Sequence, residues 1–296
     1  MKYAIFAISF AMMLASVTAF EAPYLDQKQN CSLPTKNGSF CYSGPAQVND
    51  QYYSCAVPGT IAMTFDDGPT NYTGTVLDIL KQFNVKATFF MIGDKISQYA
   101  DVVKRVVAEG HQIGSHTYNH STLVGVSPTD IAQELQMFEQ ELAKLGITIP
   151  KYFRAPHGEL DSVSLPAIQN AGYTVIHWSF LSGDSYNLTS QDIVNVYKSH
   201  LGGDTGAGVV ANQLEIITQQ HDTHTTVVDA LPDVLTYLTN VFAPSFVTVD
   251  DCLNHLNTNY TSTTVPPPPQ HSSAASISIS SSMWFATLLA ATMLFL

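Results

Sequence analysis

The feature that most constrains the fold is a regular alternation of short apolar segments with longer amphipathic ones in the middle of the chain. Strands are predicted at residues 60–65, 87–92, 112–115, 152–155, 174–179, 215–220 and 246–249, and helices at 73–83, 95–109, 127–145, 190–201 and 227–240. Seven strands that alternate with helices imply a parallel sheet, either closed as a barrel or open and doubly wound. Because no dinucleotide-binding glycine pattern follows the first strand, we favour an α/β fold built as a (β/α) barrel of about seven strands.

The segments on either side of this pattern differ from it in composition. Residues 1–19 carry one lysine and then an apolar run ending in small residues, which is typical of a secretory signal peptide. Residues 20–58 are rich in turn formers and predict an irregular, disulfide-tied lead-in to a catalytic domain at residues 59–255. Residues 256–273, which include four consecutive prolines, predict a solvated stalk.

The last segment, residues 274–296, ends in an apolar tail of about 14 residues, whereas a membrane span needs ~20. Small residues at Ser272 and Ser273, a polar spacer and this tail fit a signal for a GPI anchor attached at Ser273 or Ser272. A tail-anchored helix is the competing interpretation, and the missing cytoplasmic Lys or Arg argues against it. The sequence thus predicts secretion to the cell surface, with a GPI-anchored protein in the plasma membrane, the cell wall or both.

Four cysteines suit an oxidising compartment and allow two disulfides in three connectivities. We favour Cys55 with Cys252, which joins the entry and exit of the domain, and Cys31 with Cys41, which closes a short loop. Glycosylation sequons begin at Asn30, Asn37, Asn71, Asn119, Asn187 and Asn259. The formal charge of −12 disfavours nucleic acid and anionic membrane surfaces and is compatible with a neutral or cationic polymer.

Two adjacent carboxylates, Asp66 and Asp67, follow the first predicted strand, and Gly68-Pro69 then turns the chain. The carboxyl ends of strands are where α/β folds place their chemistry. Because adjacent residues at a strand end point to opposite sides, we expect one aspartate to hold a metal and the other to handle a proton. A polar surface turn is the competing interpretation, since each of these residues favours turns.

Two histidines, His116 and His120, follow the third predicted strand. If the segment is helical, a spacing of four places both imidazoles within reach of one ion. With Asp67 they make two imidazoles and one carboxylate on a divalent metal, with positions left open for water and substrate. Coincidental spacing is the alternative, and because oxygenase iron uses the same set, the ligands alone do not name the metal.

Later strand ends supply groups for proton transfer. Arg154 follows the fourth strand and is expected to orient a neighbouring carboxylate and keep it ionised, while the turn through His157 and Gly158 is expected to aim a backbone N–H at an oxyanion. His221 follows the sixth strand as a proton donor, and Asp184, after the fifth, is placed to orient that imidazole. Core or surface packing is the interpretation for His111, His177, His200, His255 and His271, and a buried aromatic is the one for Trp178.

Taken together, these segments resemble the polysaccharide deacetylase (NodB-like) family, and within it the fungal chitin deacetylases. The resemblance covers roughly residues 55–253. It rests on Thr-Phe-Asp-Asp-Gly-Pro from Thr64, His-Thr-x-x-His from His116, Arg-x-Pro-x-Gly from Arg154, and the His-Asp pair at His221. Each motif alone is weak, but in this order and at these separations they are specific to the family.

The resemblance implies a distorted barrel and metal-dependent hydrolysis of N-acetyl groups from N-acetylglucosamine residues of chitin, which gives chitosan and acetate. The implied metal is usually zinc, with cobalt as an alternative, on Asp67, His116 and His120. By the same resemblance Asp66 is the base and His221 the acid, tuned by Arg154 and Asp184 respectively. The implied partners are chitin or its oligomers, with the chain expected to be a monomer that meets the membrane only through its lipid.

The chain departs from the family pattern at three positions. Leu181 stands where the fourth motif usually has a second carboxylate, Ser185 where it has an aromatic residue, and His157 where the third motif has Tyr or Phe. These departures suggest a rival function, a non-catalytic wall-binding protein on the same scaffold, against which the retained aspartates and histidines argue. Within the enzyme class, an O-acetyl esterase acting on xylan is the alternative, because hydrolytic attack suits esters as well.

Overall fold

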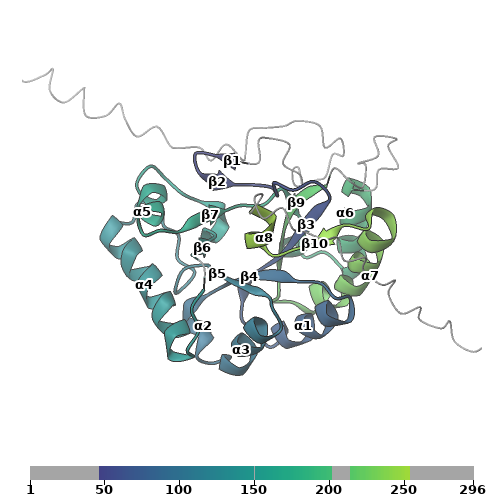
Figure 1. Cartoon of the computed structure of the whole chain (residues 1–296), viewed down its shortest axis with the longest axis horizontal. Coiled ribbons are helices and arrows are strands. Elements are labelled where there is room, and N and C mark those ends of the chain that lie inside the picture. The colour runs from purple at the N-terminus through teal and green to yellow at the C-terminus, as the bar shows by residue number, and fades with distance from the viewer. Residues whose placement is uncertain (1–46, 150, 202–213, 254–296) are drawn as a thin grey trace, which may run out of the picture. The chain divides into compact units, whose positions relative to one another are not determined.

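The computed structural model describes residues 47–149, 151–201 and 214–253 (Figure 1). The predicted signal peptide, the stalk, the GPI signal, the pairing of Cys31 with Cys41, and the sequons at Asn30, Asn37 and Asn259 lie outside these residues. So do His255 and His271. Within the described part of the chain, no helix is both long enough and apolar enough to cross a membrane.

One sheet of ten strands organises the described residues. The strands are β1 (Gln47–Val48), β2 (Gln51–Tyr52), β3 (Thr60–Gly68), β4 (Ala87–Met91), β5 (Gln112–Ser115), β6 (Tyr152–Phe153), β7 (Thr174–Ile176), β8 (Phe180–Leu181), β9 (Glu215–His221) and β10 (Ser245–Phe246). Their order is β1-β2-β7-β6-β5-β4-β3-β9-β8, with β10 beside β3, and all pairs except β1–β2 are parallel. Residues 177–179 alone separate β7 from β8, so one stretch pairs with β6 at its start and β9 at its end. The sheet is therefore a distorted barrel, as predicted.

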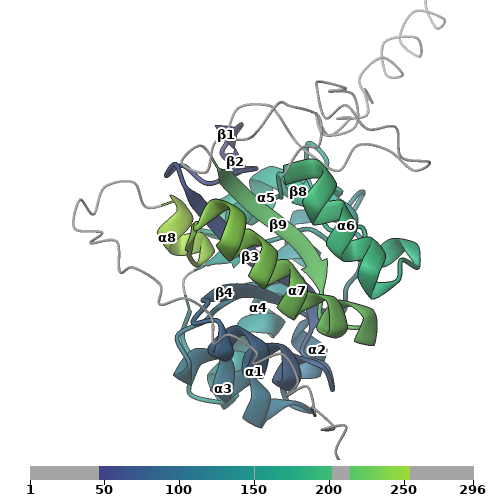
Figure 2. The same ribbon diagram turned by 90° about the vertical axis from the view of Figure 1, so that its right-hand side faces the viewer.

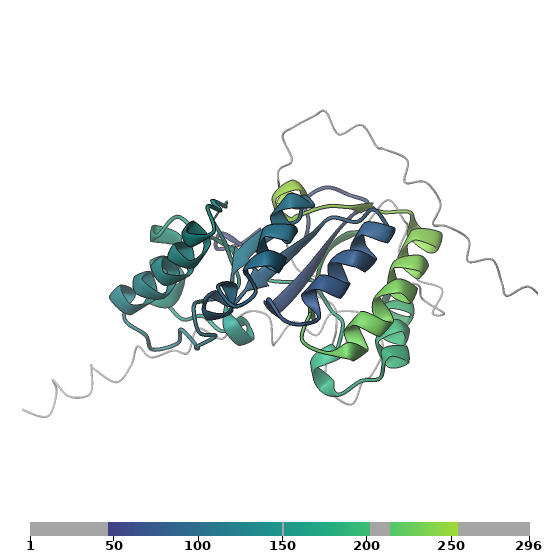
Figure 3. The ribbon, with the colours of Figure 1, turned by 90° about the horizontal axis from the view of Figure 1, so that it is seen from below.

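Helices follow the strands and cover the outer side of the sheet (Figures 1 and 3). They are α1 (Thr73–Gln82), α2 (Gly93–Ile96), α3 (Ala100–Ala108), α4 (Pro128–Lys144), α5 (Ser164–Asn170), α6 (Ser190–Leu201), α7 (Thr225–Phe242) and α8 (Val249–Leu253), with two 3₁₀ turns, η1 (Pro156–Gly158) and η2 (Asp184–Tyr186). Helix α4 begins where the Ser127 hydroxyl accepts the N–H of Asp130, which is the bond an N-cap serine makes.

The main hydrophobic core lies between these helices and the central strands. In α7, Leu231, Leu235 and Leu238 recur at helical spacing on one face and are almost fully buried. Figure 2 shows α7 running along β9 and β3. Ile61 and Met63 of β3 belong to the same hydrophobic cluster as the α7 leucines. Burying a side chain of this size contributes ~1.5–3 kcal/mol, so this layer holds the strand ends, and the polar groups on them, in fixed positions.

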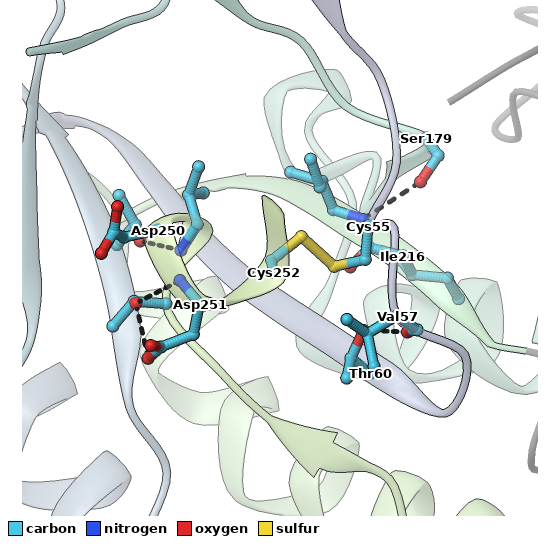
Figure 4. Close-up of a disulfide and its surroundings, with 12 residues drawn as sticks. Cys55, Val57, Thr60, Ser179, Ile216, Asp250, Asp251 and Cys252 are labelled. Carbon is cyan, nitrogen blue, oxygen red and sulfur yellow. Dashed lines mark hydrogen bonds between the residues drawn. A yellow bond between two sulfur atoms is a disulfide. The ribbon is translucent and has the colours of Figure 1, made fainter. Parts of the chain in front are cut away.

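The disulfide between Cys55 and Cys252 is present, as predicted (Figure 4). Both residues are fully buried, and the carbonyl of Cys252 accepts the N–H of Ala56 at 3.0 Å. The bond joins positions 197 residues apart, so it closes nearly the whole domain into one loop. Cross-links that close long loops restrict the unfolded chain most strongly, which stabilises the fold.

The seven predicted strands are all present, and the differences lie in short elements. Strands β1, β2 and β8 have two residues each, too few to show a period, and the first two lie in the predicted irregular lead-in. The predicted helix at 95–109 is two helices, α2 and α3, and helix α5 was not predicted. Val249 begins α8 instead of ending a strand.

Candidate active site

The end of β3 carries Asp66 and Asp67 into one pocket. Alternation along a strand predicts that adjacent side chains point to opposite sides, and this expectation is wrong here. Asp67 has a φ of 70°, and the register against β4 shifts between Asp66 and Gly68, so the strand contains a bulge. The bulge turns the second carboxylate toward the same cavity as the first. The two carboxylates still have different partners.

Asp67 lies against the two histidines of the loop after β5. Its Oδ1 is 3.3 Å from Nε2 of His116 and 3.1 Å from Nε2 of His120. The loop is irregular and not helical, and Thr117 and His120 have φ values of 67° and 61°. The expected convergence of the three side chains is thus present, but left-handed backbone produces it and helical spacing does not.

The donor atoms of this triangle fit a divalent metal. Nδ1 of His116 lies 2.8 Å from the carbonyl oxygen of Arg154, which can only accept, so Nδ1 carries the hydrogen and Nε2 presents its lone pair. That lone pair faces Oδ1 of Asp67, a buried oxygen that no hydrogen bond of good geometry reaches among the described residues. The donor atoms of Asp67, His116 and His120 all lie within 4.8 Å of one another. Converging electron pairs repel unless a cation lies between them, and second-sphere orientation of a ligand histidine by a carbonyl is common at metal sites.

Charge at Asp67 favours the same ligand. Burial raises the pKa of the Asp67 carboxyl, but where the imidazoles of His116 and His120 are protonated, their hydrogens and charge outweigh burial and hold the pKa well below its usual range. A cation bound between neutral imidazoles and Asp67 would favour the anionic carboxylate in the same way. An anionic oxygen beside two imidazoles is a set that zinc accepts.

The first carboxylate, Asp66, is held by two donors. Nη1 of Arg154 donates to Oδ1 at 2.8 Å, and Nε2 of Gln219 donates to Oδ2 at 3.2 Å. Both Asp66 and Arg154 are almost fully buried, and the guanidinium also donates to the carbonyls of Ile176 and His177. The predicted contact of Arg154 with a carboxylate is thus present. Because the guanidinium is fixed from several sides, it leaves Asp66 a single position.

His221 lies at the end of β9 and pairs with Asp184. Its Nδ1 is 3.1 Å from each carboxylate oxygen of Asp184, whose Oδ2 also accepts the backbone N–H of His221 at 2.7 Å. Burial lowers the pKa of His221, but the hydrogen bond to Asp184 and the negative charges of Asp184, Asp66 and Asp67 outweigh it and raise the pKa to about 9. The carboxylate accepts from Nδ1–H, so it leaves Nε2 as the nitrogen that faces the pocket.

The turn at His157 and Gly158 fits its predicted role in part. The N–H of Gly158 donates to the carbonyl of Ala155 at 3.0 Å and so closes the turn, which removes it as an oxyanion donor. Gly158 has a φ of 72°, and a Cβ there would lie 2.9 Å from the Trp178 ring, so only glycine fits. The exposed His157 has a φ of 59°, and its ring packs edge-on to His120 with centroids 5.1 Å apart.

Asp222 packs against Gly68, at the turn that follows Asp67. A Cβ at Gly68 would lie 2.6 Å from Oδ2 of Asp222, and the same oxygen accepts the Thr73 hydroxyl. The Thr70 hydroxyl donates to the Asp222 carbonyl. Burial raises the pKa of Asp222 to about 7, since the hydrogen bond from Thr73 does not offset the loss of water.

These groups surround one pocket of about 510 Å³. Its walls are Asp66, Asp67, His116, His120, Ala155, His157, Gly158, Glu159, His177, Trp178, Leu181, Ser185, Tyr186, Gln219 and His221. The sequence reasoning missed Gln219, although it precedes His221 by two positions on one strand and period-two alternation puts both on the same face. His177 was assigned to packing, and a buried aromatic was favoured over a sugar-cleft wall for Trp178; both residues are buried and also line the pocket. His111 is buried and structural, as predicted, since its ring accepts the N–H of Ala87.

At the carboxyl ends of the parallel strands, two carboxylates, an imidazole paired with a third carboxylate, and a triangle that could hold a metal share one pocket, an arrangement typical of hydrolytic enzymes. A model of the polysaccharide deacetylase family matches residues 54–176. A chitin deacetylase of Pestalotiopsis sp is 33% identical over 210 residues, which are 70% of this chain and 68% of that protein. A peptidoglycan-N-acetylglucosamine deacetylase of Bacillus cereus is 37% identical over 136 residues, 46% of this chain and 50% of that protein.

A solved structure shares the fold. The chitin deacetylase of the fungal pathogen Colletotrichum lindemuthianum superposes with a TM-score of 0.62 at 31% identity, covering 71% of this chain and 93% of that one. The chain belongs to the polysaccharide deacetylase family. It is a deacetylase, a hydrolase that releases acetyl groups.

Proposed function

We propose that this enzyme hydrolyses the N-acetyl groups of chitin, releasing acetate and leaving chitosan, with a divalent metal held by Asp67, His116 and His120. The observation that carries the proposal is that the metal-ligand triangle, Asp66 and His221 all border one pocket. The metal is proposed to be zinc, with cobalt as the alternative, because two imidazoles and one carboxylate suit borderline-soft ions. When bound, such an ion polarises the acetamide carbonyl and lowers the pKa of water.

Asp66 is the base of the proposed reaction. It takes a proton as the water oxygen bonds to the acetamide carbon, and its ion pair with Arg154 fixes the receiving oxygen in place. The carbonyl oxygen gains negative charge in this step. The N–H of His157, in the turn that borders the pocket, is the backbone donor proposed for it, in place of the Gly158 N–H that the turn consumes.

His221 is the acid of the proposed reaction. An amine leaves poorly as an anion, so the carbon–nitrogen bond breaks as Nε2 of His221 gives its proton to the nitrogen. The raised pKa of about 9 keeps this proton on the ring at neutral pH, and Asp184 holds the ring by Nδ1. Acetate and a free amine on the sugar are the products, and the protons balance when Asp66 returns its proton to solvent and His221 regains one.

The choice of chitin is supported by the pocket and by the named relatives. Aromatic and apolar side chains, Trp178, Tyr186 and Leu181, share the pocket wall with the reactive groups, which suits the mixed surface of a sugar ring. Relatives named as chitin deacetylases are similar over about 70% of this chain, and several other relatives are named for peptidoglycan. Peptidoglycan is therefore the second candidate substrate.

An acetate assay tests the proposal. Purified enzyme is given chitin oligomers, peptidoglycan and acetylated xylan, with metal content measured on the same sample and Asp66→Asn as the inactive control. We expect acetate from chitin oligomers, lost after chelation and restored by zinc or cobalt. Acetate from peptidoglycan or xylan alone would replace chitin as the substrate. Undiminished release from a chelated, metal-free sample would refute metal dependence.

The proposal also includes secretion and a lipid anchor at Ser273 or Ser272, on the grounds of the sequence patterns at the two ends. Three sequons lie in the described part of the chain, at Asn71, Asn119 and Asn187, and all three are exposed. Treatment of cells with a phospholipase specific for GPI lipids is expected to release the enzyme with its glycans. Retention in the membrane after treatment would favour a tail-anchored helix.

A further inference from the structure

Gln219 contacts both Asp66 and His221 and has no role in the reaction proposed above. It lies on β9 with 8% of its surface exposed, and it borders the pocket. Its Nε2 donates to Oδ2 of Asp66 at 3.2 Å and lies 3.1 Å from Nε2 of His221. One amide group thus touches both the base and the acid.

The chemistry of the amide fixes its orientation. An amide nitrogen has two hydrogens and only donates, and Oδ2 of Asp66 beside it accepts. Nε2 of His221 also accepts once the ring has given up the proton that it donates in the proposed reaction, because Asp184 then still takes the hydrogen on Nδ1. With the amide turned around, its oxygen would face the Asp66 carboxylate, and the nitrogen would lie where Oε1 is, a buried atom with no hydrogen-bond partner among the described residues.

The side chain supplies this wall with amide hydrogens that an apolar side chain of the same shape lacks. Such a replacement would leave the buried Oδ2 of Asp66 without its donor. Position 219 is also held by its strand, since its carbonyl accepts the N–H of Ser182 at 3.0 Å in the β8–β9 pairing. The side chain therefore reaches the pocket from a rigid base.

We propose that Gln219 is a positioning residue that joins Asp66 to His221 and fixes the separation of base and acid. The inference rests on the roles proposed above for these two residues. Asp66 is held by Arg154 on Oδ1 and by Gln219 on Oδ2. His221 is held by Asp184 on Nδ1 and, when its ring is neutral, by Gln219 on Nε2. Without the shared amide, each reactive group keeps one support and can turn about it.

Two aryl substrates distinguish the effect of Gln219 on the base, Asp66, from its effect on the acid, His221. Hydrolysis of 4-nitrophenyl acetate needs the base, but its phenolate leaves without a proton, whereas the amine of 4-nitroacetanilide must be protonated by the acid. The two molecules differ only by O and NH at the bond that breaks. Loss of base positioning lowers both rates, and loss of acid positioning lowers only the anilide rate. His221→Ala calibrates the second case.

The deciding variant is Gln219→Met, with Gln219→Leu as a second apolar variant, and Gln220→Met is the matched control. Gln220 is the next residue on β9, is 2% exposed, bonds the Tyr197 hydroxyl and does not border the pocket. For Gln219→Met we expect kcat/KM to fall about 10-fold on the ester and about 100-fold on the anilide, mostly in kcat, with metal content unchanged. Gln220→Met should leave the ratio of the two rates unchanged, whatever it does to thermal stability.

A nitrogen NMR measurement gives a readout that does not depend on turnover. At a pH above 9, where the His221 ring is neutral, the resonance of its Nε2 should move when Gln219 is replaced by Met or Leu and stay in place in Gln220→Met. Equal losses on ester and anilide, or an unmoved Nε2 resonance in a folded Gln219 variant, would overturn the proposal. Acetate release from chitin oligomers by the wild type is measured in parallel, so failure of the chitin assignment is recognised separately from failure of this inference.

Discussion

The two halves of the site are built in different ways. The proposed proton-transfer half consists of Asp66, Arg154, His221 and Asp184. All but the partly exposed His221 are buried, and Asp66 lies directly opposite His221 in the regular β3–β9 register. The metal half has Asp67 at a bulge and His120 on an irregular loop, both partly exposed and both with positive φ. Regular pairing fixes the first half before any ligand arrives. Converging electron pairs mean that the second half is complete only with a cation.

The sharpest test of this difference is to remove a metal ligand, and it should give the largest effect. His116→Ala deletes one imidazole of the triangle, so we expect the purified protein to lose its metal and, with it, nearly all activity, a loss of ~10⁴-fold or more. Metal analysis and acetate release are measured on one sample. His157→Ala is the matched control, because this ring touches His120 but lies outside the ligand set, and it should keep its metal. Full metal occupancy in His116→Ala would remove the distinction between the halves.

Removing the base should give the next largest effect and should spare the metal. Asp66→Asn keeps the shape and an acceptor oxygen for Arg154 but cannot take a proton, so we expect a loss of about 10²- to 10⁴-fold in kcat with normal metal content. Because Arg154 is fully buried, it loses the charge that balances it, and the melting temperature should fall as well. Loss of metal in this variant would show that the two halves are one unit.

Removing the support of the acid should give a smaller effect that depends on pH. Asp184 raises the pKa of His221 to about 9, so the acid form is present below that pH and is lost as the pH rises through it. In Asp184→Asn the pKa falls toward its ordinary value of 6.5, and the alkaline limb of the kcat/KM profile should move to lower pH. We also expect about a 10²-fold loss at neutral pH on chitin oligomers. Asp192→Asn, at an exposed aspartate of α6, is the control and should leave the limb in place.

The same contrast explains how far the sequence predicted this site. Strand periodicity and polar residues at strand ends were enough for the barrel and for Arg154, Asp184 and His221, because regular pairing follows from the pattern of side chains. The sequence predicted that Asp67, His116 and His120 converge, but it assumed a helix at the two histidines. The segment that carries them is an irregular loop. Left-handed residues such as Asp67 and His120 depend on tertiary contacts and leave no local signal in the sequence.

Gly158 and Gln219 illustrate the two kinds of error within the site. Of the predicted backbone donors in the turn through His157 and Gly158, the N–H of Gly158 is bonded to the carbonyl of Ala155, and only the path of the backbone reveals that bond. Gln219 could be found from period-two alternation, but a search for ionisable groups passes over a neutral amide. The sheet has ten strands where about seven were predicted, because two-residue strands such as β8 are too short to show a pattern in the sequence.

The smallest expected effect concerns Asp222, which follows His221 in the chain and packs against Gly68, the residue after Asp67 at the end of β3. It therefore lies where the two halves meet. Burial raises its folded pKa to about 7 from an ordinary value of 3.8, so its contribution to stability is present below about pH 4 and is lost as the pH rises through 7. Asp222→Asn keeps the shape and has no charge to bury. The melting temperature of the variant minus that of the wild type should therefore increase between pH 4 and pH 8, by several degrees, with little change in kcat/KM at neutral pH. Titrating groups that do not interact with Asp222 are common to both proteins and cancel in this difference, whereas Asp67 and His221 interact with Asp222 and contribute to it. If the difference in melting temperature is the same at both pH values, Asp222 is not a buried charge. If the variant loses much of its metal, the carboxylate of Asp222, and not only its volume, shapes the end of β3 that carries Asp67.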